Sequence, residues 1–287
     1  MKIAVIVNLS KENAVRCSKE ITEIFRKNGA EVLMWQGCSG YFEGEKIEFY
    51  PTYSELVKQC DMALTVGGDG TIIHAAKIAA TEHKPLIGVN VGRLGFAADV
   101  EPYEIDRLPM LLTGNYGVQK RMLLDITVEH TLGENKKFIA VNDAIIARGQ
   151  LSRIIDLKVS LNNQFISSYR ADGLLFSTPT GSTAYSLSAG GPIIDPEMDC
   201  ILMTPVCPHS LYSRSVVFAS KSALSVTTPI DDECRAVLTV DGQESLELNN
   251  STRVVIKKSD LTLDLLTLDK RNFYTRLNKK LKEREGS

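Results

Sequence analysis

Asp69 lies among three glycines, in a stretch whose residue types could bind and transfer a phosphate group. The stretch reads Met62-Ala-Leu-Thr-Val-Gly-Gly-Asp-Gly-Thr-Ile-Ile-His74. Its apolar part predicts an inner strand of a parallel sheet, and glycines without Cβ atoms let backbone N–H groups approach a phosphate at the start of a helix. A carboxylate in such an anion-binding turn is suited to handle a proton or a metal ion. The alternative is a tight turn in which Asp69 only caps the helix.

A second block, at residues 177–192, is rich in hydroxyl groups. It reads Ser177-Thr-Pro-Thr-Gly-Ser-Thr-Ala-Tyr-Ser-Leu-Ser-Ala-Gly-Gly-Pro192. Thr180 or Ser182 could cap a helix that starts near Thr183, and hydroxyl and N–H groups at a helix N-terminus suit the phosphates and ribose of a dinucleotide. The alternative is a turn and helix with a purely structural role.

The elements that must hold the first stretch alternate between strands and helices. Apolar runs predict strands at residues 2–7, 31–35, 62–66 and 85–90, and helical spacing predicts helices at 11–28, 51–60, 71–81 and 102–112. Ser10 could cap the first helix, and residues 36–50 are expected to be a flexible connection. Such β-α-β units predict a parallel sheet, in which the glycine-rich turns after two strands mark one ligand site.

The second half of the chain has a different pattern. Short, β-branched and often alternating segments predict strands at residues 123–128, 138–141, 154–161, 164–169, 215–218, 223–227, 236–240, 253–257 and 261–266. These strands indicate a β-rich, sandwich-like domain. The tail at residues 272–287 is charged and expected to be helical, with a docking role or a solvated end as alternatives.

Composition excludes several classes of protein. The 287 residues are 24% charged and 44% hydrophobic with a net charge of −2, which is typical of a soluble globular protein and predicts no nucleic-acid partner. No apolar run reaches the roughly 18 residues of a membrane span, so no membrane partner is expected. The six scattered cysteines include no CxxC pair, which predicts a reduced, cytoplasmic protein without structural zinc. Neither GxGxxG nor GxxxxGK[ST] occurs, which disfavours a Rossmann dehydrogenase and a P-loop kinase.

Three segments in a fixed order resemble the NAD kinase family, bacterial type. They are Gly-Gly-Asp69-Gly, then Asn142-Asp143, then the block at 178–192. The resemblance spans Ile3 to about Thr267 and includes the run at residues 88–96. It implies an α/β N-terminal domain with a Rossmann-like parallel sheet at 1–116, an all-β sandwich-like domain at 117–267, and a tail at 268–287 that returns to the first domain. The implied activity is that of a phosphotransferase with an alcohol acceptor, which uses ATP to phosphorylate the adenosine ribose 2′-hydroxyl of NAD and gives NADP.

The same resemblance implies roles for individual residues. Asp69 matches the family's proposed general base, and Gly67, Gly68 and Gly70 would hold the ATP phosphates. The family's usual Asn-Glu pair is Asn142-Asp143 here, with a shorter acceptor. The residues that match the family's NAD contacts are Asp69, Gly70, His74, Asn142, Asp143, Arg153, Arg170, Asp172, Thr183, Ala184, Tyr185, Ser186, Leu187, Ser188 and Gln243.

The family also implies partners for the chain. Mg²⁺ or another divalent cation would accompany ATP and be held mainly by phosphates and water, so no protein residue is named as a metal ligand. A homodimer or homotetramer is expected, in which a neighbouring β domain completes the NAD pocket. Two alternatives stay open: a kinase of a lipid or sugar phosphate on the same architecture, and a non-catalytic NADP(H)-binding sensor. The choice between ATP and polyphosphate as donor is also open.

Overall fold

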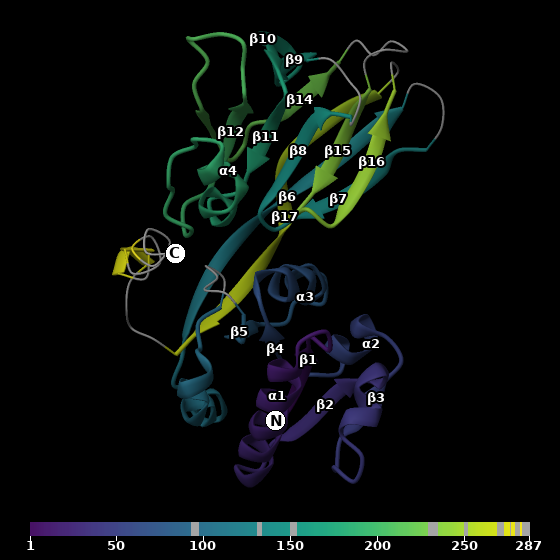
Figure 1. Ribbon diagram of the computed structural model, residues 1–287, viewed down its shortest axis with the longest axis vertical. Helices are drawn as coiled ribbons and strands as arrows, with labels where there is room; N and C mark the ends of the chain where they lie inside the picture. Colours follow the sequence, from purple (N-terminus) through teal and green to yellow (C-terminus); the bar gives the residue numbers. More distant parts are fainter. Residues whose placement is uncertain are drawn as a thin grey trace. The chain divides into compact units, whose positions relative to one another are not determined.

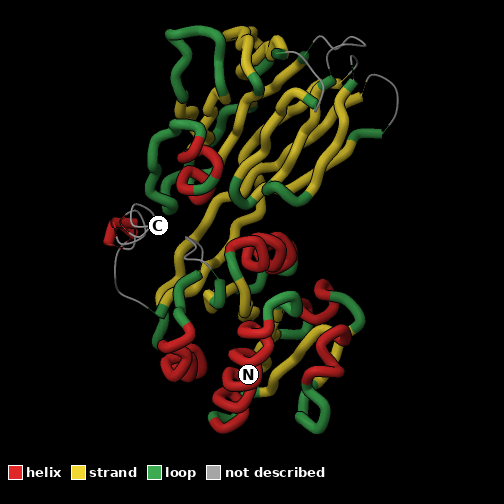
Figure 2. Tube along the Cα trace, in the orientation of Figure 1, coloured by secondary structure: helices red, strands yellow, loops and turns green. Residues whose placement is uncertain are grey.

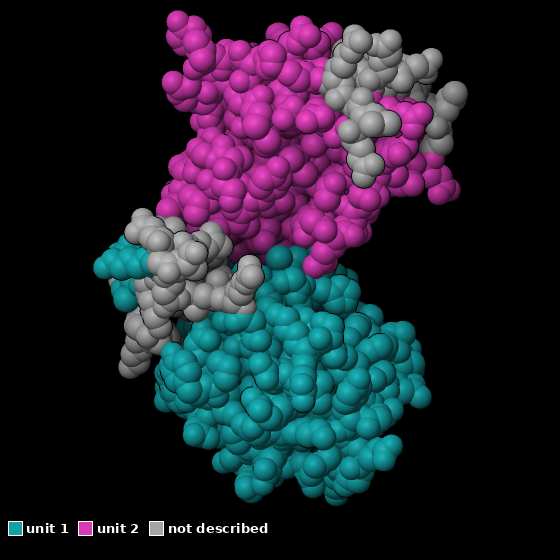
Figure 3. Space-filling model, viewed as in Figure 1, with its two compact units in different colours: residues 1–121, 262–287 teal, residues 122–261 magenta. Residues whose placement is uncertain are grey.

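The computed structural model describes residues 1–92, 98–130, 134–149, 154–228, 235–249, 252–268, 273–275, 277, 278 and 282. The chain forms two compact units, one made of residues 1–121 and 262–287 and the other of residues 122–261 (Figure 3). Each unit has its own apolar core. Among the described residues, no helix is long and apolar enough to cross a membrane.

Unit 1 is a parallel sheet with helices (Figure 1). Its strands follow the order β5-β4-β1-β2-β3, and every pair in that series is parallel. Strand β4 is buried along its whole length, as its continuous apolar sequence predicts. The elements are β1 (Lys2–Val7), α1 (Glu12–Lys27), β2 (Glu31–Trp35), η1 (Gln36–Tyr41), β3 (Glu48–Tyr50), α2 (Tyr53–Lys58), β4 (Met62–Gly67), α3 (Asp69–Thr81), β5 (Leu86–Asn90) and η2 (Pro102–Thr113).

Unit 2 consists mainly of strands, as the yellow trace of Figure 2 shows, and neighbouring strands within it pair antiparallel. One sheet has the order β13-β12-β11-β8-β15-β16, and the other contains β10-β9-β14-β17 with β6 and β7. The elements are β6 (Gly117–His130), β7 (Lys136–Ala140), β8 (Asp143–Arg148), β9 (Ile155–Leu161), β10 (Gln164–Ala171), β11 (Gly173–Ser177), η3 (Thr180–Thr183), α4 (Tyr185–Ser188), β12 (Cys200–Val206), β13 (Val216–Ala219), β14 (Leu224–Thr227), β15 (Ala236–Val240), β16 (Glu244–Leu248) and β17 (Thr252–Thr267).

Buried side chains from both of these sheets form one core, which is the arrangement of a sandwich. The predicted fold class, an α/β parallel-sheet part followed by a β-rich part, is therefore confirmed. The predicted domain limits at 116, 117 and 267 stay predictions. Strands β6 and β17 each contain residues of both units, and the end of β17 pairs in parallel with β5 through Leu265 and Leu86.

Several predicted elements were wrong. Residues 36–50 are not one flexible connection, because they contain η1 and β3, and β3 pairs with β2. The two strands expected at 253–257 and 261–266 are a single strand, β17. Ser10 does not cap α1, because its hydroxyl donates instead to Asn8 Oδ1 at 2.6 Å. The sequence patterns also missed strands β8, β11, β12 and β16.

Candidate functional site

The turn after β4 presents Asp69 at the start of α3. Gly68 is the residue that precedes the helix, and its carbonyl accepts from the N–H groups of Thr71 at 3.0 Å and Ile72 at 3.2 Å. The alternative in which Asp69 caps the helix is therefore wrong, since Asp69 lies within the first helical turn. A Cβ atom at Gly67 would lie 2.4 Å from Thr71 Oγ1, so only glycine lets the strand end this close to the helix.

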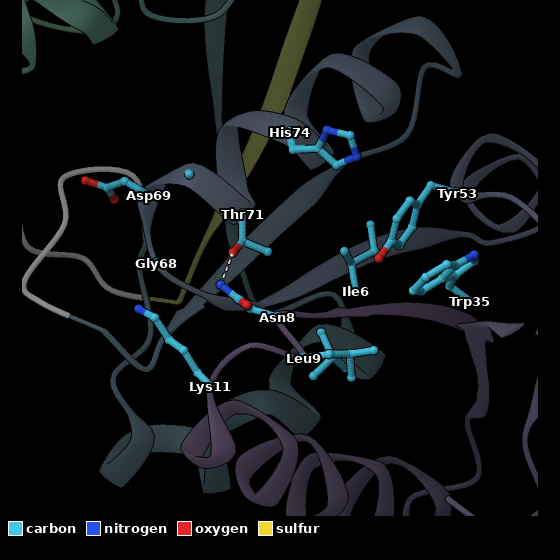
Figure 4. A pocket seen from close by; sticks show the side chains of 12 residues that line it. Ile6, Asn8, Leu9, Lys11, Trp35, Tyr53, Gly68, Asp69, Thr71 and His74 are labelled. Atoms are coloured by element: carbon cyan, nitrogen blue, oxygen red, sulfur yellow. Dashed lines mark hydrogen bonds between the residues drawn. The ribbon is translucent and has the colours of Figure 1, made fainter. Parts of the chain in front are cut away.

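A cavity of about 780 Å³ opens beside this turn within unit 1 (Figure 4). This volume is within the range of small-molecule binding sites. Gly68, Asp69, Gly70 and His74 line it together, as the sequence predicts, whereas Gly67 does not. The full lining consists of Ile6, Val7, Asn8, Leu9, Lys11, Trp35, Tyr53, Gly68, Asp69, Gly70, Thr71 and His74.

The polar end of the cavity contains two residues that the sequence did not point to, Asn8 and Lys11. Asn8 Nδ2 donates to Thr71 Oγ1 at 3.2 Å, which ties the end of β1 to α3. Lys11 Nζ lies close to the backbone of both glycine turns. A Cβ atom built on Gly92 would be 2.7 Å from this nitrogen, and one built on Gly68 would be 3.5 Å from it. A cation and a helix N-terminus therefore meet at the turn that carries Asp69, and both attract anions.

The opposite end of the cavity is aromatic. The rings of Trp35 and Tyr53 have centroids 5.1 Å apart and are tilted by 31°. His74 meets Tyr53 edge to face at 5.6 Å, so its imidazole belongs to this aromatic group. Figure 4 shows these three side chains on one side of the cavity, with Lys11 and Asp69 on the other.

In unit 2, the backbone at Asn142 and Asp143 is held by Asp241, a turn residue whose contact with this pair the sequence did not predict. The Asp241 carboxylate accepts three backbone N–H bonds, from Val141 at 3.0 Å, Asn142 at 2.8 Å and Asp143 at 3.1 Å. The Asp143 side chain is buried, and burial together with the charge of Asp241 raises the pKa of that carboxyl to about 7. Asp143 is the first residue of strand β8 (Asp143–Arg148).

The hydroxyl-rich block packs directly against this pair. The Thr178 N–H donates to the Asn142 carbonyl at 2.9 Å, and the Thr178 hydroxyl donates to the Val141 carbonyl at 2.7 Å. A Cβ atom at Gly181 would lie 2.1 Å from the same Asn142 oxygen, so the close approach requires glycine there. The structure therefore brings two of the predicted site segments together.

Within the block, the side chains have different environments. Neither Thr180 nor Ser182 caps a helix, and the Ser182 hydroxyl donates instead to the Pro179 carbonyl at 2.7 Å. Ser186 is fully buried, with its hydroxyl 3.2 Å from that of Thr204. Among the predicted contacts within this block, Tyr185 and Ser188 are exposed, Ala184 and Leu187 are half-buried, and Thr183 is buried.

Asp172 lies at the other end of the β8–β11 pair from Asp143. Asp143 is paired with Ser177, whereas the Arg148 N–H at the far end of β8 donates to the Asp172 carbonyl at 2.9 Å. The two positions are five residue steps apart along the strands, which is roughly 17 Å. The Asp172 carboxylate also accepts from Arg148 Nε at 2.8 Å. The exposed Arg170 lies beside this end, so unit 2 holds two separate groups of predicted site residues.

The two remaining predicted residues add little to either group. Gln243 is exposed in the turn after β15, and its N–H donates to the Val240 carbonyl at 3.0 Å. The same turn carries Asp241, whose carboxylate accepts from the N–H groups of Asn142 and Asp143. Gln243 is therefore two residues along the chain from a member of that group. Arg153 lies outside the described residues.

Comparisons with known proteins agree with this two-part arrangement. Residues 3–116 match the family model of the ATP-NAD kinase N-terminal domain, and residues 141–268 match that of the ATP-NAD kinase C-terminal domain. Among solved structures, yeast NADH kinase complexed with NADH has a TM-score of 0.90 at 23% identity, over 98% of this chain and 87% of that one. An NAD kinase from Archaeoglobus fulgidus in complex with ATP has a TM-score of 0.74 at 20% identity, over 98% and 99% of the two chains. Both structures share the fold.

Curated relatives are more similar in sequence. An NAD kinase of Acetivibrio thermocellus is 36% identical over 100% of this chain and 99% of the relative. An NAD kinase of Desulforamulus reducens is 36% identical over 98% of this chain and 97% of the relative. Because both family models match in the expected order and these relatives align over nearly the whole chain, the chain belongs to the NAD kinase family of enzymes.

Proposed function

We propose that the chain transfers the γ-phosphoryl group of ATP to the adenosine ribose 2′-hydroxyl of NAD, which gives NADP, with Asp69 as the general base. The observation that carries this proposal is the position of Asp69 in the first turn of α3, on the wall of the cavity. Among the described residues that line the cavity, Asp69 is the only acid and Lys11 is the only Lys or Arg. A carboxylate within hydrogen-bond reach of the ribose hydroxyl aligns it and accepts its proton.

The rest of the polar end neutralises and positions the phosphates. Phosphoryl transfer depends mainly on alignment and on stabilisation of the charge that spreads over the phosphoryl oxygens. The N-terminal N–H groups of α3 at Gly70, and the Lys11 ammonium over Gly68, supply positive charge where the donor's phosphates would lie. The role of Gly67 is to let α3 approach the strand end, since its own Cβ position is filled by Thr71.

A divalent cation fits this arrangement as a companion of the nucleotide. When bound with the nucleotide, it would lower the repulsion between the charged phosphates. The described residues include no group of three or more His, Cys, Asp or Glu that could hold a metal ion. The cation would be held by the nucleotide's phosphates and by water, and Asp69 is the one carboxylate among the described residues of the cavity wall.

The two groups in unit 2 are proposed to bind the two ends of NAD. The group around Asn142 and Asp143 offers carbonyl and carboxyl acceptors to adenine or ribose, and Tyr185 adds an exposed aromatic face. The group of Asp172 and Arg170 suits the nicotinamide end. A separation of roughly 17 Å along the strands fits an extended dinucleotide better than a single small ligand. The remaining proposed contacts are Gly70, His74, Arg153, Thr183, Ala184, Ser186, Leu187, Ser188 and Gln243.

NADP formation from NAD, ATP and Mg²⁺ tests the proposal directly. We expect Asp69→Asn to keep its fold and its affinity for NAD and to lose roughly 10²- to 10⁴-fold in rate, because a general base contributes on that order. Glu12→Gln is the matched control, since Glu12 is an exposed carboxylate in the first turn of α1 and should keep full rate. A wild-type chain that binds NAD and makes no NADP with ATP or polyphosphate would instead be a dinucleotide sensor.

A cytoplasmic location and a homodimer or homotetramer stay predictions. Native mass spectrometry with and without NAD measures the oligomeric state, and a monomer with full activity would contradict a pocket completed by a neighbouring chain.

A further inference from the structure

At the aromatic end of the unit 1 cavity, only His74 has a role in the proposal above, as an NAD contact, and Trp35 and Tyr53 have none. Its wall consists of Trp35, Tyr53 and His74, with the apolar side chains of Ile6 and Leu9 beside them (Figure 4). Phosphate binding and proton transfer are served by the other end, where Lys11 and Asp69 lie. An apolar, ring-lined extension of a phosphate site is suited to a ligand that carries an apolar or aromatic group beside its phosphates.

The ring pair is fixed in place by its surroundings. Trp35 Nε1 donates to the Pro51 carbonyl at 3.0 Å, and a Cβ atom at Gly37 would lie 2.2 Å from the indole ring. The indole is thus held by a hydrogen bond at its edge and by close contact with a glycine backbone. Tyr53 lies at a centroid distance of 5.1 Å, within the range of favourable aromatic pairs. Both rings are half-buried, so each keeps surface that a ligand can cover.

We infer that Trp35 and Tyr53 form a nucleobase subsite, which makes the phosphoryl donor a nucleoside triphosphate and not inorganic polyphosphate. This inference rests on the proposed function, because it takes the molecule bound in this cavity to be the phosphoryl donor of that reaction. The cavity joins an anion-binding end to an aromatic end, and a nucleoside triphosphate has the same two parts in one molecule. Polyphosphate would leave the aromatic end unused. His74, edge-on to Tyr53, closes the subsite next to the first turns of α3.

Trp35 makes the inference measurable, because it is the only tryptophan in the chain. We expect ADP and ATP to quench its fluorescence saturably and tripolyphosphate not to quench it, although tripolyphosphate should compete with ATP for the polar end. NAD should not produce the same quenching. Saturable quenching by NAD with no response to ATP would overturn the inference, because the subsite would then hold the acceptor's base.

Substitution of Tyr53 gives the quantitative test. Stacking of a base on one aromatic side chain predicts that Tyr53→Ala weakens ATP binding by about 5- to 150-fold in calorimetry and leaves tripolyphosphate binding unchanged. Tyr53→Phe keeps the ring and should keep the affinity. Tyr41→Ala is the control, since Tyr41 is an exposed tyrosine outside the described cavity wall. Far-UV circular dichroism and an unchanged Kd for NAD verify that each variant is folded.

Steady-state kinetics separate this inference from the proposed function. With the wild-type activity established, Tyr53→Ala should raise KM for ATP with little change in kcat or in KM for NAD. An unchanged KM and Kd for ATP would refute the subsite and leave the kinase function intact. If no donor yields NADP but ATP still quenches Trp35 and needs Tyr53, the kinase function fails and the nucleobase subsite stands.

Discussion

Replacement of Asp143 by asparagine should change how the stability of the chain depends on pH. The Asp143 side chain is 6% exposed, and burial plus the charge of Asp241 raises the pKa of its carboxyl from 3.8 to about 7. Because the folded-state pKa is raised, the stabilising effect of the protonated form is fully present below pH 4 and is lost as the pH rises to 7. The amide of the Asp143→Asn variant would stay neutral throughout, with nearly the same shape.

The size of the effect follows from the pKa difference. One pKa unit corresponds to about 1.4 kcal/mol, so the wild type loses about 4 kcal/mol in all relative to the variant as the pH rises from well below 4 to well above 7. Over the experimentally convenient range from pH 5 to pH 8, the advantage of Asp143→Asn should therefore grow by about 3 kcal/mol. The advantage grows with pH because burial and the neighbouring carboxylate both disfavour the charged form of Asp143.

Urea unfolding followed by far-UV circular dichroism measures the free energy of unfolding at pH 5, 6, 7 and 8. Asp156→Asn is the control, since Asp156 is exposed on β9, and its curve should run parallel to that of the wild type. Parallel curves for Asp143→Asn and the wild type would refute the reasoning, as would an advantage that shrinks with rising pH.

Three further outcomes are expected. Gly181→Ala should lower stability by roughly 1–3 kcal/mol in calorimetry, because its Cβ atom would overlap the Asn142 carbonyl; an unchanged melting temperature would contradict that contact. Arg107→Met should lower stability by about 1–2 kcal/mol, since Arg107 donates to the Leu268 carbonyl at 2.6 Å, and it should speed amide exchange near residue 268. In a Cys234→Ser background, a thiol reagent at pH 8 should modify Cys207 fast and the buried thiols only after unfolding, because burial raises the pKa to about 11 for Cys17, Cys38 and Cys60.

Strand patterns predicted unit 1 better than the middle of unit 2. Strands β1, β4 and β5 are continuous apolar runs separated by helical spacing, so their period and order were visible in the sequence. Strands β8 and β11 lie inside a sheet with neighbours on both edges, and β11 is buried at every residue. A short run of that kind shows no alternation that distinguishes it from a turn or a helix segment.

The candidate site divides in the same way. Asp69 was predictable because glycines and a carboxylate adjoin in sequence and their chemistry is local. Lys11 and Asp241 were not, since each reaches its place only through strand pairing. Lys11 follows a strand whose Val7 pairs with Val66 of β4, and Asp241 meets Asp143 because β15 lies beside β8. Registers between distant strands have no signal in one sequence.

The return of β17 to unit 1 has a consequence for the order of folding during synthesis. Asp99 accepts hydrogen bonds from the Thr267 hydroxyl and the Leu268 N–H, each at 2.7 Å, and Leu265 pairs with Leu86. These partners emerge from the ribosome only after residues 122–261 have been made. A nascent chain therefore contains all residues of the second unit before the first unit has the end of β17. The unit that begins the chain therefore cannot finish folding until the second unit has been synthesised, unlike domains that can each fold as soon as they are made.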